Sequence, residues 1–189
     1  MPSRRKKSIT FKDTLIMKIS TDRLDLVAAT FAHVQAELDC TDRLAQMLGS
    51  ALGPEWPPGE HDRDAQEYFL DCLQKGGPAA TGWHGWYVII RDPQAVVIGT
   101  GGYHGLPRDN GDVEIGFSIM TGWQKRGYAT ELVRALVARA FSHNRVSRVI
   151  AQTTAGNSAS CKVLEKAGFQ LVVLDQPQET LCFELHRPD

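Results

Sequence analysis

A short basic turn, residues 124–129 (QKRGYA), has the composition of an anion-binding site. It follows a segment that alternates like a strand, residues 113–120, and it precedes a run of apolar residues at helical spacing. Where a strand turns into a helix, the first backbone N–H groups of the helix are unpaired and lie at the positive end of its dipole. Gly127 has no Cβ, so a ligand can approach the backbone closely, and Lys125 and Arg126 add positive charge. The turn therefore predicts a site for a diphosphate.

A second motif, NSASCKVLEKAGF at residues 157–169, has the signals of a short helix. Asn157 is a good N-cap residue. Gly168 is a typical helix stop, and Phe169 can fold back on Leu164 beside it. The motif therefore predicts a helix that starts at Asn157 and ends before Gly168.

These motifs, taken in order, resemble those of the GNAT N-acetyltransferases. The turn at 124–129 is similar to the Q/R-x-x-G-x-G/A pyrophosphate loop of that superfamily, and the 157–169 motif follows it as it does in the family. The opening TDRLDL (21–26) and the strand VEIGFSI (113–119) are most similar to the RimJ/RimL branch, which acetylates protein N-termini and some small amines. The resemblance covers residues 21–184 and implies the GNAT fold.

The resemblance also implies acetyl-CoA as the co-substrate and no metal ion. In the family, backbone N–H groups of the loop bind the diphosphate, and the pantetheine arm pairs like an added strand with the end of the central strand. The asparagine at the helix start also hydrogen-bonds the cofactor. The cofactor-binding residues implied for this chain are Phe117, Ile119, Met120, Gln124, Lys125, Arg126, Gly127, Tyr128, Ala129, Thr130 and Asn157. The six histidines are too scattered to predict a metal site.

Glu114 is the acidic residue inside the predicted central strand. Acetyl transfer needs a neutral amine, and a nearby carboxylate can accept the amine's proton directly or through water. Many GNAT enzymes have a glutamate at the equivalent point of this strand, so the resemblance implies a catalytic role. The alternatives are a solvent-facing carboxylate, or one that binds the peptide or holds the structure of the site.

Ser160 is the second candidate catalytic residue. Many GNAT enzymes have a tyrosine seven residues after the asparagine, which protonates the departing thiolate, but this chain has Leu164 there. The RimL-like branch has a serine three residues after the asparagine, and Ser160 matches it. Its hydroxyl would bind the developing charge on sulfur or relay a proton through water. The alternative is that Ser160 only supports the first turn of the helix through its backbone.

The acceptor site has weaker signals. Trp56, Trp83, Tyr103 and His104 are candidate substrate contacts. The tryptophans could equally pack in the core or anchor a loop, and His104 could be an ordinary surface histidine. In this fold the acceptor is selected by the first helices and loops, here residues 32–82, which carry no readable motif. The acceptor class predicted is a protein N-terminal α-amine or a small-molecule amine.

The length and composition are those of one cytoplasmic domain, residues 21–187, behind a basic N-terminal tail, residues 1–20. No apolar run approaches the ~20 residues of a membrane span, and four cysteines far apart predict neither zinc nor disulfides. Four of the 21 Lys and Arg residues lie at residues 4–7; the other 17 face 22 Asp and Glu residues, so the body is not expected to bind nucleic acid. The tail could contact nucleic acid or ribosomes, or be an unstructured end. A homodimer is one option for assembly.

Hydrophobic periodicity predicts a mixed α/β fold, a central mixed sheet flanked by helices. Residues 129–141 form the clearest helix, and the strands around it, 113–120 and 148–153, would pair in parallel through a right-handed crossover. The other predicted strands cover residues 21–28, 83–91, 95–103, 170–174 and 181–186. Two further helices would start after Thr30 and after Asp62 or Asp64, and residues 45–60 are predicted to be a loop.

The function predicted is transfer of an acetyl group from acetyl-CoA to a primary amine by direct attack in a ternary complex. A backbone N–H near Ile119 would stabilise the oxyanion. Two other functions remain open: a non-catalytic acyl-CoA-sensing module, because a fold can outlive its chemistry, and a structural or interaction protein that uses the basic tail. Glu114, Ser160 and the intact loop favour the enzyme.

Overall fold

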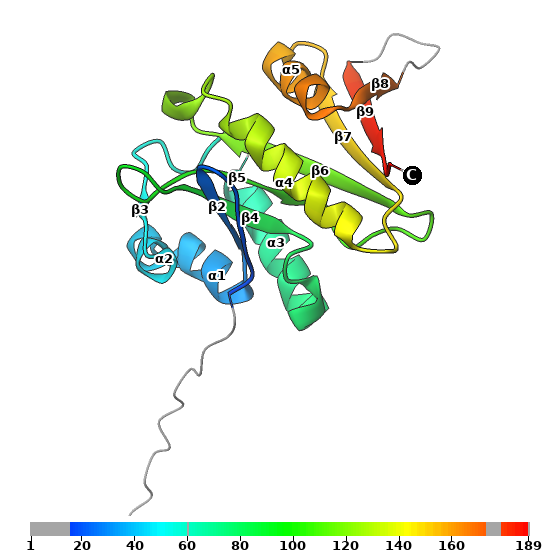
Figure 1. The fold of residues 1–189 in the computed structure, drawn as a ribbon. Coiled ribbons are helices and arrows are strands. Elements are labelled where there is room, and N and C mark those ends of the chain that lie inside the picture. The colour runs from blue at the N-terminus through cyan, green and yellow to red at the C-terminus, as the bar shows by residue number, and fades with distance from the viewer. Residues whose placement is uncertain (1–15, 60, 173–178, 189) are drawn as a thin grey trace, which may run out of the picture.

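The strand that carries Glu114, β6 (Asp112–Ile119), lies inside the sheet between β5 and β7. The structure, a computed structural model, describes residues 16–59, 61–172 and 179–188. Its strands form one sheet in the order β1-β2-β4-β5-β6-β7-β9-β8, and β3 pairs with β5 (Figure 1). The other strands are β1 (Lys18–Ser20), β2 (Leu24–Ala28), β3 (Ala51–Leu52), β4 (Gly85–Ile90), β5 (Val96–Tyr103), β7 (Arg148–Thr154), β8 (Gln170–Val172) and β9 (Thr180–His186).

The pair β6–β7 is parallel, and the chain passes between its strands through α4 (Tyr128–Ser142), as predicted. β3 also runs parallel to β5, whereas the remaining neighbours are antiparallel. The mixed α/β sheet with flanking helices that the sequence predicts is therefore confirmed.

Helices cover both faces of the sheet. Helix α4 crosses one face, and α1 (Phe31–Asp39), α2 (Thr41–Leu48) and α3 (Arg63–Gly76) lie on the other, against β2, β4 and β5 (Figure 1). The apolar stripe that predicts α4 is its buried face, since Leu132, Val133 and Leu136 have no exposed surface. Helix α5 (Ser158–Ala167) follows β7, and a short 3-10 turn, η1 (Gly77–Ala80), follows α3.

The predicted helix caps agree with the structure. The Thr30 side chain caps α1, and Asp62 rather than Asp64 caps α3, its carboxylate accepting a 3.0 Å hydrogen bond from the Ala65 N–H. Gly168 ends α5 in a left-handed conformation, with the Phe169 N–H bonded to the Leu164 carbonyl at 3.0 Å.

Two local predictions were wrong. Residues 41–48 form α2 and residues 51–52 form β3, so two elements occupy the first half of the predicted loop. The helix carries Leu44, Met47 and Leu48 at helical spacing, but at eight residues it is too short for a clear periodic signal. Strand β1 pairs Lys18 with Val27, so the sheet begins before residue 21, where the domain was expected to start. The basic residues at 4–7 lie outside the described residues.

Three further features of the described residues concern function class. None of their helices is both long enough and apolar enough to cross a membrane. No group of three or more His, Cys, Asp or Glu side chains among them could hold a metal ion. Cys40, Cys72, Cys161 and Cys182 are free thiols.

Candidate active site

A wedge opens between β6 and β7. The two strands pair over only four residues, from Asp112 to Ile115 on β6. Beyond that point β6 stays with β5 as far as Ile119, while β7 stays with β9 as far as Thr154. We use "wedge" for the space between residues 116–119 of β6 and the end of β7, where one edge of β6 has lost its strand partner.

Backbone groups of Phe117 and Ile119 face the wedge. On the β5 side, the Glu114 carbonyl accepts a 2.9 Å hydrogen bond from the His104 N–H. Because backbone groups alternate in direction along a strand, those of Phe117 and Ile119 point away from β5. An extended ligand in the wedge can therefore pair with them as an added strand would.

Met120, predicted to bind the cofactor, does not belong to this edge. Its N–H bonds to β5, its carbonyl accepts a 2.8 Å hydrogen bond from the Trp123 N–H, and its side chain is buried. The carbonyl of Ile119 accepts a 2.8 Å hydrogen bond from Gln124 Nε2, which ties the loop to the end of the strand. The edge that remains consists of Phe117 and the N–H of Ile119.

The loop between β6 and α4 turns through two left-handed residues, Lys125 with φ 60° and Gly127 with φ 85°. Gly127 is the N-cap residue of α4, and in the described chain no side chain caps this helix. The first-turn N–H groups, which belong to Tyr128, Ala129 and Thr130, are therefore available to an anion.

Arg23, which the sequence analysis did not single out, braces this loop. Its guanidinium donates hydrogen bonds to the Arg126 carbonyl at 2.9 Å and to the Glu131 carboxylate at 2.7 Å. A Cβ at Gly127 would lie 3.3 Å from its Nη2. Although burial acts to raise it, the pKa of Glu131 is held below its usual value by hydrogen bonds from Thr21 and Arg23. The start of β2 and α4 are thus locked together beside the turn.

A surface hollow beside α4 gathers three basic side chains, Arg23, Arg134 and Lys166. Its lining is mixed in charge because Asp22 and Glu131 also reach it, but Glu131 is paired with Arg23. Arg134 donates a 2.7 Å hydrogen bond to the Lys166 carbonyl and so joins α4 to α5. Spacing in the sequence could not reveal this group, because its members come from three separate elements.

The face of β6 opposite α4, which we call the acceptor side after the role predicted for Glu114, carries the candidate base. Glu114, Gly116 and Ser118 point to this face, because the alternate residues pack in the core with α4. The Glu114 side chain is 13% exposed, with Oε2 3.0 Å from Arg108 Nη2 and Oε1 3.5 Å from His104 Nδ1. The structure thus brings two predicted residues, Glu114 and His104, side by side.

A loop crosses the same face near the end of β6. We call residues 53–59 the acceptor loop. A Cβ on Gly59 would lie 2.6 Å from Ser118 Oγ, so only glycine permits this approach. The Gly122 N–H donates a 3.1 Å hydrogen bond to Glu55 Oε2, which joins the acceptor loop to the start of the β6–α4 loop.

A buried carboxylate, Glu37 of α1, holds the acceptor loop in place. Its side chain is 1% exposed and accepts hydrogen bonds from Trp56 Nε1 at 3.1 Å and from the Tyr87 hydroxyl at 2.7 Å. His61 Nε2 lies 3.0 Å from it and Gln66 Nε2 3.3 Å. Burial, and then Glu37, raise the pKa of Tyr87 well above its usual value. Trp56, a predicted substrate contact, is therefore an anchor of the acceptor loop, on the acceptor side.

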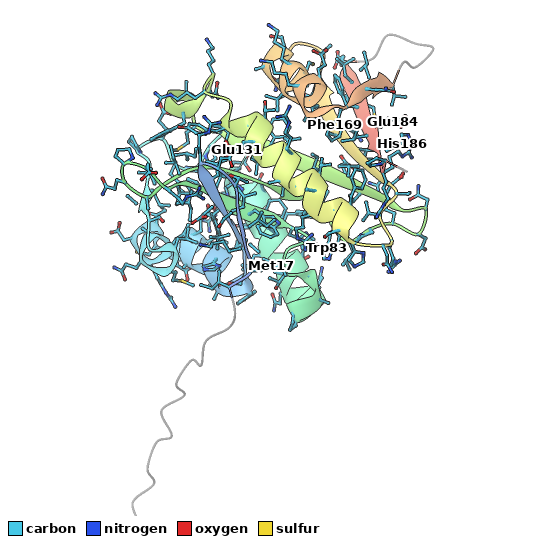
Figure 2. All side chains as sticks on the ribbon, in the orientation of Figure 1. Met17, Trp83, Glu131, Phe169, Glu184 and His186 are labelled. Atoms are coloured by element: carbon cyan, nitrogen blue, oxygen red, sulfur yellow. The ribbon has the colours of Figure 1, made fainter. Side chains whose placement is uncertain are left out.

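Trp83 and Tyr103 do not reach the acceptor side. They are 6% and 0% exposed, with ring centroids 5.2 Å apart in the core under α4. The Tyr103 hydroxyl donates a 2.6 Å hydrogen bond to the Leu136 carbonyl, and burial raises its pKa to about 12. Arg139 lies 4.5 Å over the Trp83 ring, and Figure 2 shows Trp83 near the opposite end of α4 from Glu131. The structure gives both aromatic residues a role in the core instead of the predicted substrate contact.

Asn157 and Ser160 lie at the start of α5, after the strand that forms the other side of the wedge. Asn157 Oδ1 accepts a 3.1 Å hydrogen bond from the Ser160 N–H, so the predicted cap is present. Among the described residues no hydrogen bond involves the Ser160 hydroxyl. The backbone N–H of Ser160 serves the cap.

This chain is similar to known proteins in sequence and in fold. Residues 23–170 match the family model described as an acetyltransferase (GNAT) domain. YjdG of Bacillus subtilis, named an uncharacterized N-acetyltransferase, is 32% identical over 153 residues, which cover 81% of this chain and 89% of YjdG. YoaA of the same organism, also named an uncharacterized N-acetyltransferase, is 35% identical over 85 residues, which cover 45% of this chain and 48% of YoaA.

Two solved structures share the fold. RimL, described as a ribosomal L7/L12 alpha-N-protein acetyltransferase in complex with coenzyme A, has a TM-score of 0.62 and 15% identity, over 90% of this chain and 98% of RimL. The ribosomal-protein-S5-alanine acetyltransferase of Vibrio fischeri has a TM-score of 0.62 and 16% identity, over 92% and 98% of the two chains. The fold is thus the one that the resemblance to the RimJ/RimL branch implies. The family model matches most of the length of this chain, and the chain is similar to YjdG along nearly all of the length of YjdG. This chain therefore belongs to the GNAT acetyltransferases.

Proposed function

We propose that this enzyme transfers an acetyl group from acetyl-CoA to a primary amine, either a protein N-terminal α-amine or a small-molecule amine, in a ternary complex. The observation that carries the proposal is the continuity of the wedge with the turn. A free strand edge at Phe117 and Ile119 leads into the left-handed Gly127 and the uncapped start of α4. One extended ligand with anionic groups at one end fits both features.

The residues present suit the two parts of CoA. The N–H groups at the start of α4 and the positive charge of Arg134 and Lys166 suit its phosphates. The backbone groups of Phe117 and Ile119 suit the amides of its pantetheine arm, which can pair with a strand edge. Gly127 has no side chain, so the approach to the start of α4 stays open. A Cβ at this position would lie only 3.3 Å from Arg23 Nη2.

The chemistry follows from the same placement. Bound acetyl-CoA supplies a thioester whose carbonyl carbon an amine can attack. The Ile119 N–H would hold the carbonyl oxygen as it gains negative charge. Glu114 would receive the amine's proton, directly or through a neighbouring group, and the Ser160 hydroxyl would hydrogen-bond the departing sulfur. Holding both reactants in one site removes much of the entropic barrier.

An α-amine, or a small amine of lowered pKa, suits this site better than a lysine side chain. At pH 7 an α-amine with a pKa of about 7.7 costs about 1 kcal/mol to deprotonate, against about 4.6 kcal/mol for a lysine near 10.4. The two enzymes of the same fold are named for an alpha-N-protein and an S5-alanine acetyl transfer. Both observations support an α-amine acceptor.

A screen of acetyl-CoA consumption tests the proposal. The acceptors are peptide amides with a free N-terminal serine or alanine, the same peptides blocked at the N-terminus with an internal lysine, free amino acids, spermidine and kanamycin. We expect turnover with free N-termini or small amines and slower turnover with internal lysines. CoA binding in calorimetry without turnover of any amine would instead support the acyl-CoA-sensing module, and absence of CoA binding would refute the site.

A further inference from the structure

His104 lies between the Glu114 carboxylate and the bare backbone of Gly116. Its Nδ1 is 3.5 Å from Glu114 Oε1. At the other side of the ring, Nε2 is 3.0 Å from the position that a Cβ on Gly116 would take. The His104 side chain is 52% exposed, so an amine can reach it. The imidazole therefore stands between the carboxylate and the point where the free edge of β6 begins.

Arg108 fixes the orientation of the carboxylate. Its Nη2 donates a 3.0 Å hydrogen bond to Glu114 Oε2, and its own N–H bonds to the Asp112 carbonyl at 2.8 Å within the β5–β6 turn. With Oε2 held, Oε1 stays directed at His104. A 3.5 Å contact is longer than a hydrogen bond, as polar contacts in active sites without substrate often are, and a small rotation of the half-exposed ring closes it.

The carboxylate selects one tautomer of the ring. A carboxylate oxygen accepts hydrogen bonds, so a contact between Glu114 and Nδ1 favours the tautomer with the proton on Nδ1 and the lone pair on Nε2. Serine hydrolases use the same order, in which a carboxylate orients an imidazole that takes the proton. In this chain Nε2 of His104 lies against Gly116, next to Phe117 at the edge of the wedge, and the half-exposed ring has to turn for its lone pair to meet an amine.

Two other titratable groups lie near this pair. Burial, with a smaller effect of His104, lowers the pKa of His84 from its usual value, so His84 stays neutral at pH 7. Burial raises the pKa of the Cys182 thiol, and the charges of Glu184 and Glu114 add to this, so Cys182 stays protonated. An imidazole with a lowered pKa and a protonated thiol are both poor acceptors of an amine's proton near pH 7.

We propose that His104 is the general base of this enzyme and that Glu114 is a positioning residue which acts through it; the inference rests on the proposed acetyl transfer. Nε2 of His104 removes one proton from the ammonium group of the acceptor. The freed nitrogen lone pair forms the C–N bond with the acetyl carbon, and the C–S bond breaks with its electron pair on sulfur. The second nitrogen proton passes to sulfur, and the imidazolium of His104 returns its proton to solvent.

Kinetics of His104→Gln, Glu114→Gln and the double variant test the order of the two residues, with the fastest acceptor of the screen. We expect His104→Gln to lower kcat at pH 7 by about 100-fold or more, with recovery as the pH rises and free amine becomes available without a base. CoA affinity in calorimetry should not change. The double variant should lose much less than the product of the two single losses, because the two residues act as one unit.

His186→Gln is the matched control. His186 Nε2 lies 3.3 Å from Glu184 Oε1 and its side chain is 64% exposed, so it is also an exposed histidine beside a carboxylate of the sheet. It lies on β9, opposite the start of β7 where β6 and β7 are still paired, and Figure 2 shows it beside Glu184 on that strand. This variant should keep the kcat and the pH profile of the parent.

A measurement without turnover tests the geometry separately. Nitrogen-15 NMR of the imidazoles should show His104 with its proton on Nδ1, and Glu114→Ala should shift the proton toward Nε2. A proton on Nε2 in the parent, an unchanged kcat in His104→Gln, or a change in the KM for the amine alone would each overturn the proposal. Failure of the parent enzyme to acetylate any amine would refute the proposed function, and the tautomer would still decide whether Glu114 orients His104.

Discussion

Gly127 has a left-handed backbone conformation that suits glycine, and a side chain there would obstruct a ligand that approaches the start of α4. Its φ is 85°, and a Cβ would lie 3.3 Å from Arg23 Nη2. Gly127→Glu should lower CoA affinity about 100-fold or more, equivalent to about 2.7 kcal/mol, because it adds strain and a negative charge where the diphosphate is proposed to bind. Calorimetry with CoA measures the loss.

Gly49→Glu separates backbone strain from the loss of the site. Gly49 has φ 60° at the end of α2, and a Cβ there would meet no atom within 4 Å. This control should lose similar stability and keep its CoA affinity. A folded Gly127→Glu protein that binds CoA as tightly as the parent would show that the loop is wrongly assigned.

Ser160 offers a test that leaves its structural role intact. Its backbone N–H donates a hydrogen bond to the N-cap side chain of Asn157, and alanine keeps that N–H. Ser160→Ala should therefore change stability by less than about 0.5 kcal/mol. We expect kcat to fall about tenfold, the worth of a hydrogen bond to charge developing on sulfur, because a thiolate with a pKa of about 8.5 can also leave unaided. Ser158→Ala is the control, and a lower melting temperature with normal kcat would assign Ser160 to the scaffold.

Residues whose role depends on a few neighbours in the chain could be predicted, whereas residues whose role depends on a sheet face could not. Asn157 and Gly127 belong to a helix start and a turn, so their neighbours predict their structural roles. Tyr103 and His104 are adjacent in sequence, but one packs under α4 and the other lies beside Glu114. Both faces of β5 are covered by other elements, and the sequence pattern did not show which residue faces which side.

The elements show the same division. The stripe of α4 predicts its buried face because one helix side carries its apolar core contacts. Helix α2 was missed because its apolar pattern is short, and the contacts that hold the acceptor loop could not be predicted because they join segments that are distant in the sequence. Glu37 is one such contact: a charged residue in an amphipathic helix is expected to be exposed, yet its side chain is 1% exposed and is surrounded by hydrogen-bond donors.

The acceptor loop should depend on the Glu37 carboxylate. Glu37→Gln replaces one of the two carboxylate oxygens with an NH2 donor, which would face either the N–H of Trp56 or the hydroxyl of Tyr87, and it removes the negative charge. We expect a loss of about 1–3 kcal/mol of stability. The KM for the amine should rise more than the Kd for CoA, because the loop lies on the acceptor side of the sheet.

Thermal unfolding, CoA calorimetry and amine kinetics together check this expectation. Glu67→Gln is the control, since Glu67 is an exposed carboxylate of α3 that pairs with Arg63 at 2.8 Å. It should change stability by less than about 0.5 kcal/mol. Equal losses of amine and CoA binding in Glu37→Gln would mean that the acceptor loop supports the whole site and does not select the acceptor.

The whole molecule is a sheet that is tied at one end and open at the other. Arg148 of β7 donates hydrogen bonds to both oxygens of Asp112 on β6, at 2.8 and 2.7 Å, and to Glu184 on β9 at 2.8 Å. Three strands are thus joined where the β6–β7 pairing begins, and the wedge opens where that pairing ends. The parallel pair was predictable from its crossover helix, but this ion cluster was not, because its members lie far apart in the chain.

Asp112→Asn tests how much this tie stabilises the protein. Hydrogen bonds from Arg148 hold the pKa of Asp112 below its usual value, although burial opposes them. A lowered pKa in the folded state means that ionised Asp112 stabilises the fold above the usual value of about 3.9, and that this stabilisation is lost as the pH falls through the lower, folded-state value.

Asp112→Asn should cost about 1–3 kcal/mol at pH 7, less than a fully buried pair because the Arg148 side chain is 34% exposed. Thermal unfolding at several pH values should show the difference from the parent shrinking below pH ~4. Asp109→Asn, which changes a fully exposed carboxylate 3.6 Å from Arg145, should match the parent throughout. A difference between Asp112→Asn and the parent that stays constant from pH 7 to pH 3 would show that the ionised carboxylate does not hold the strands together.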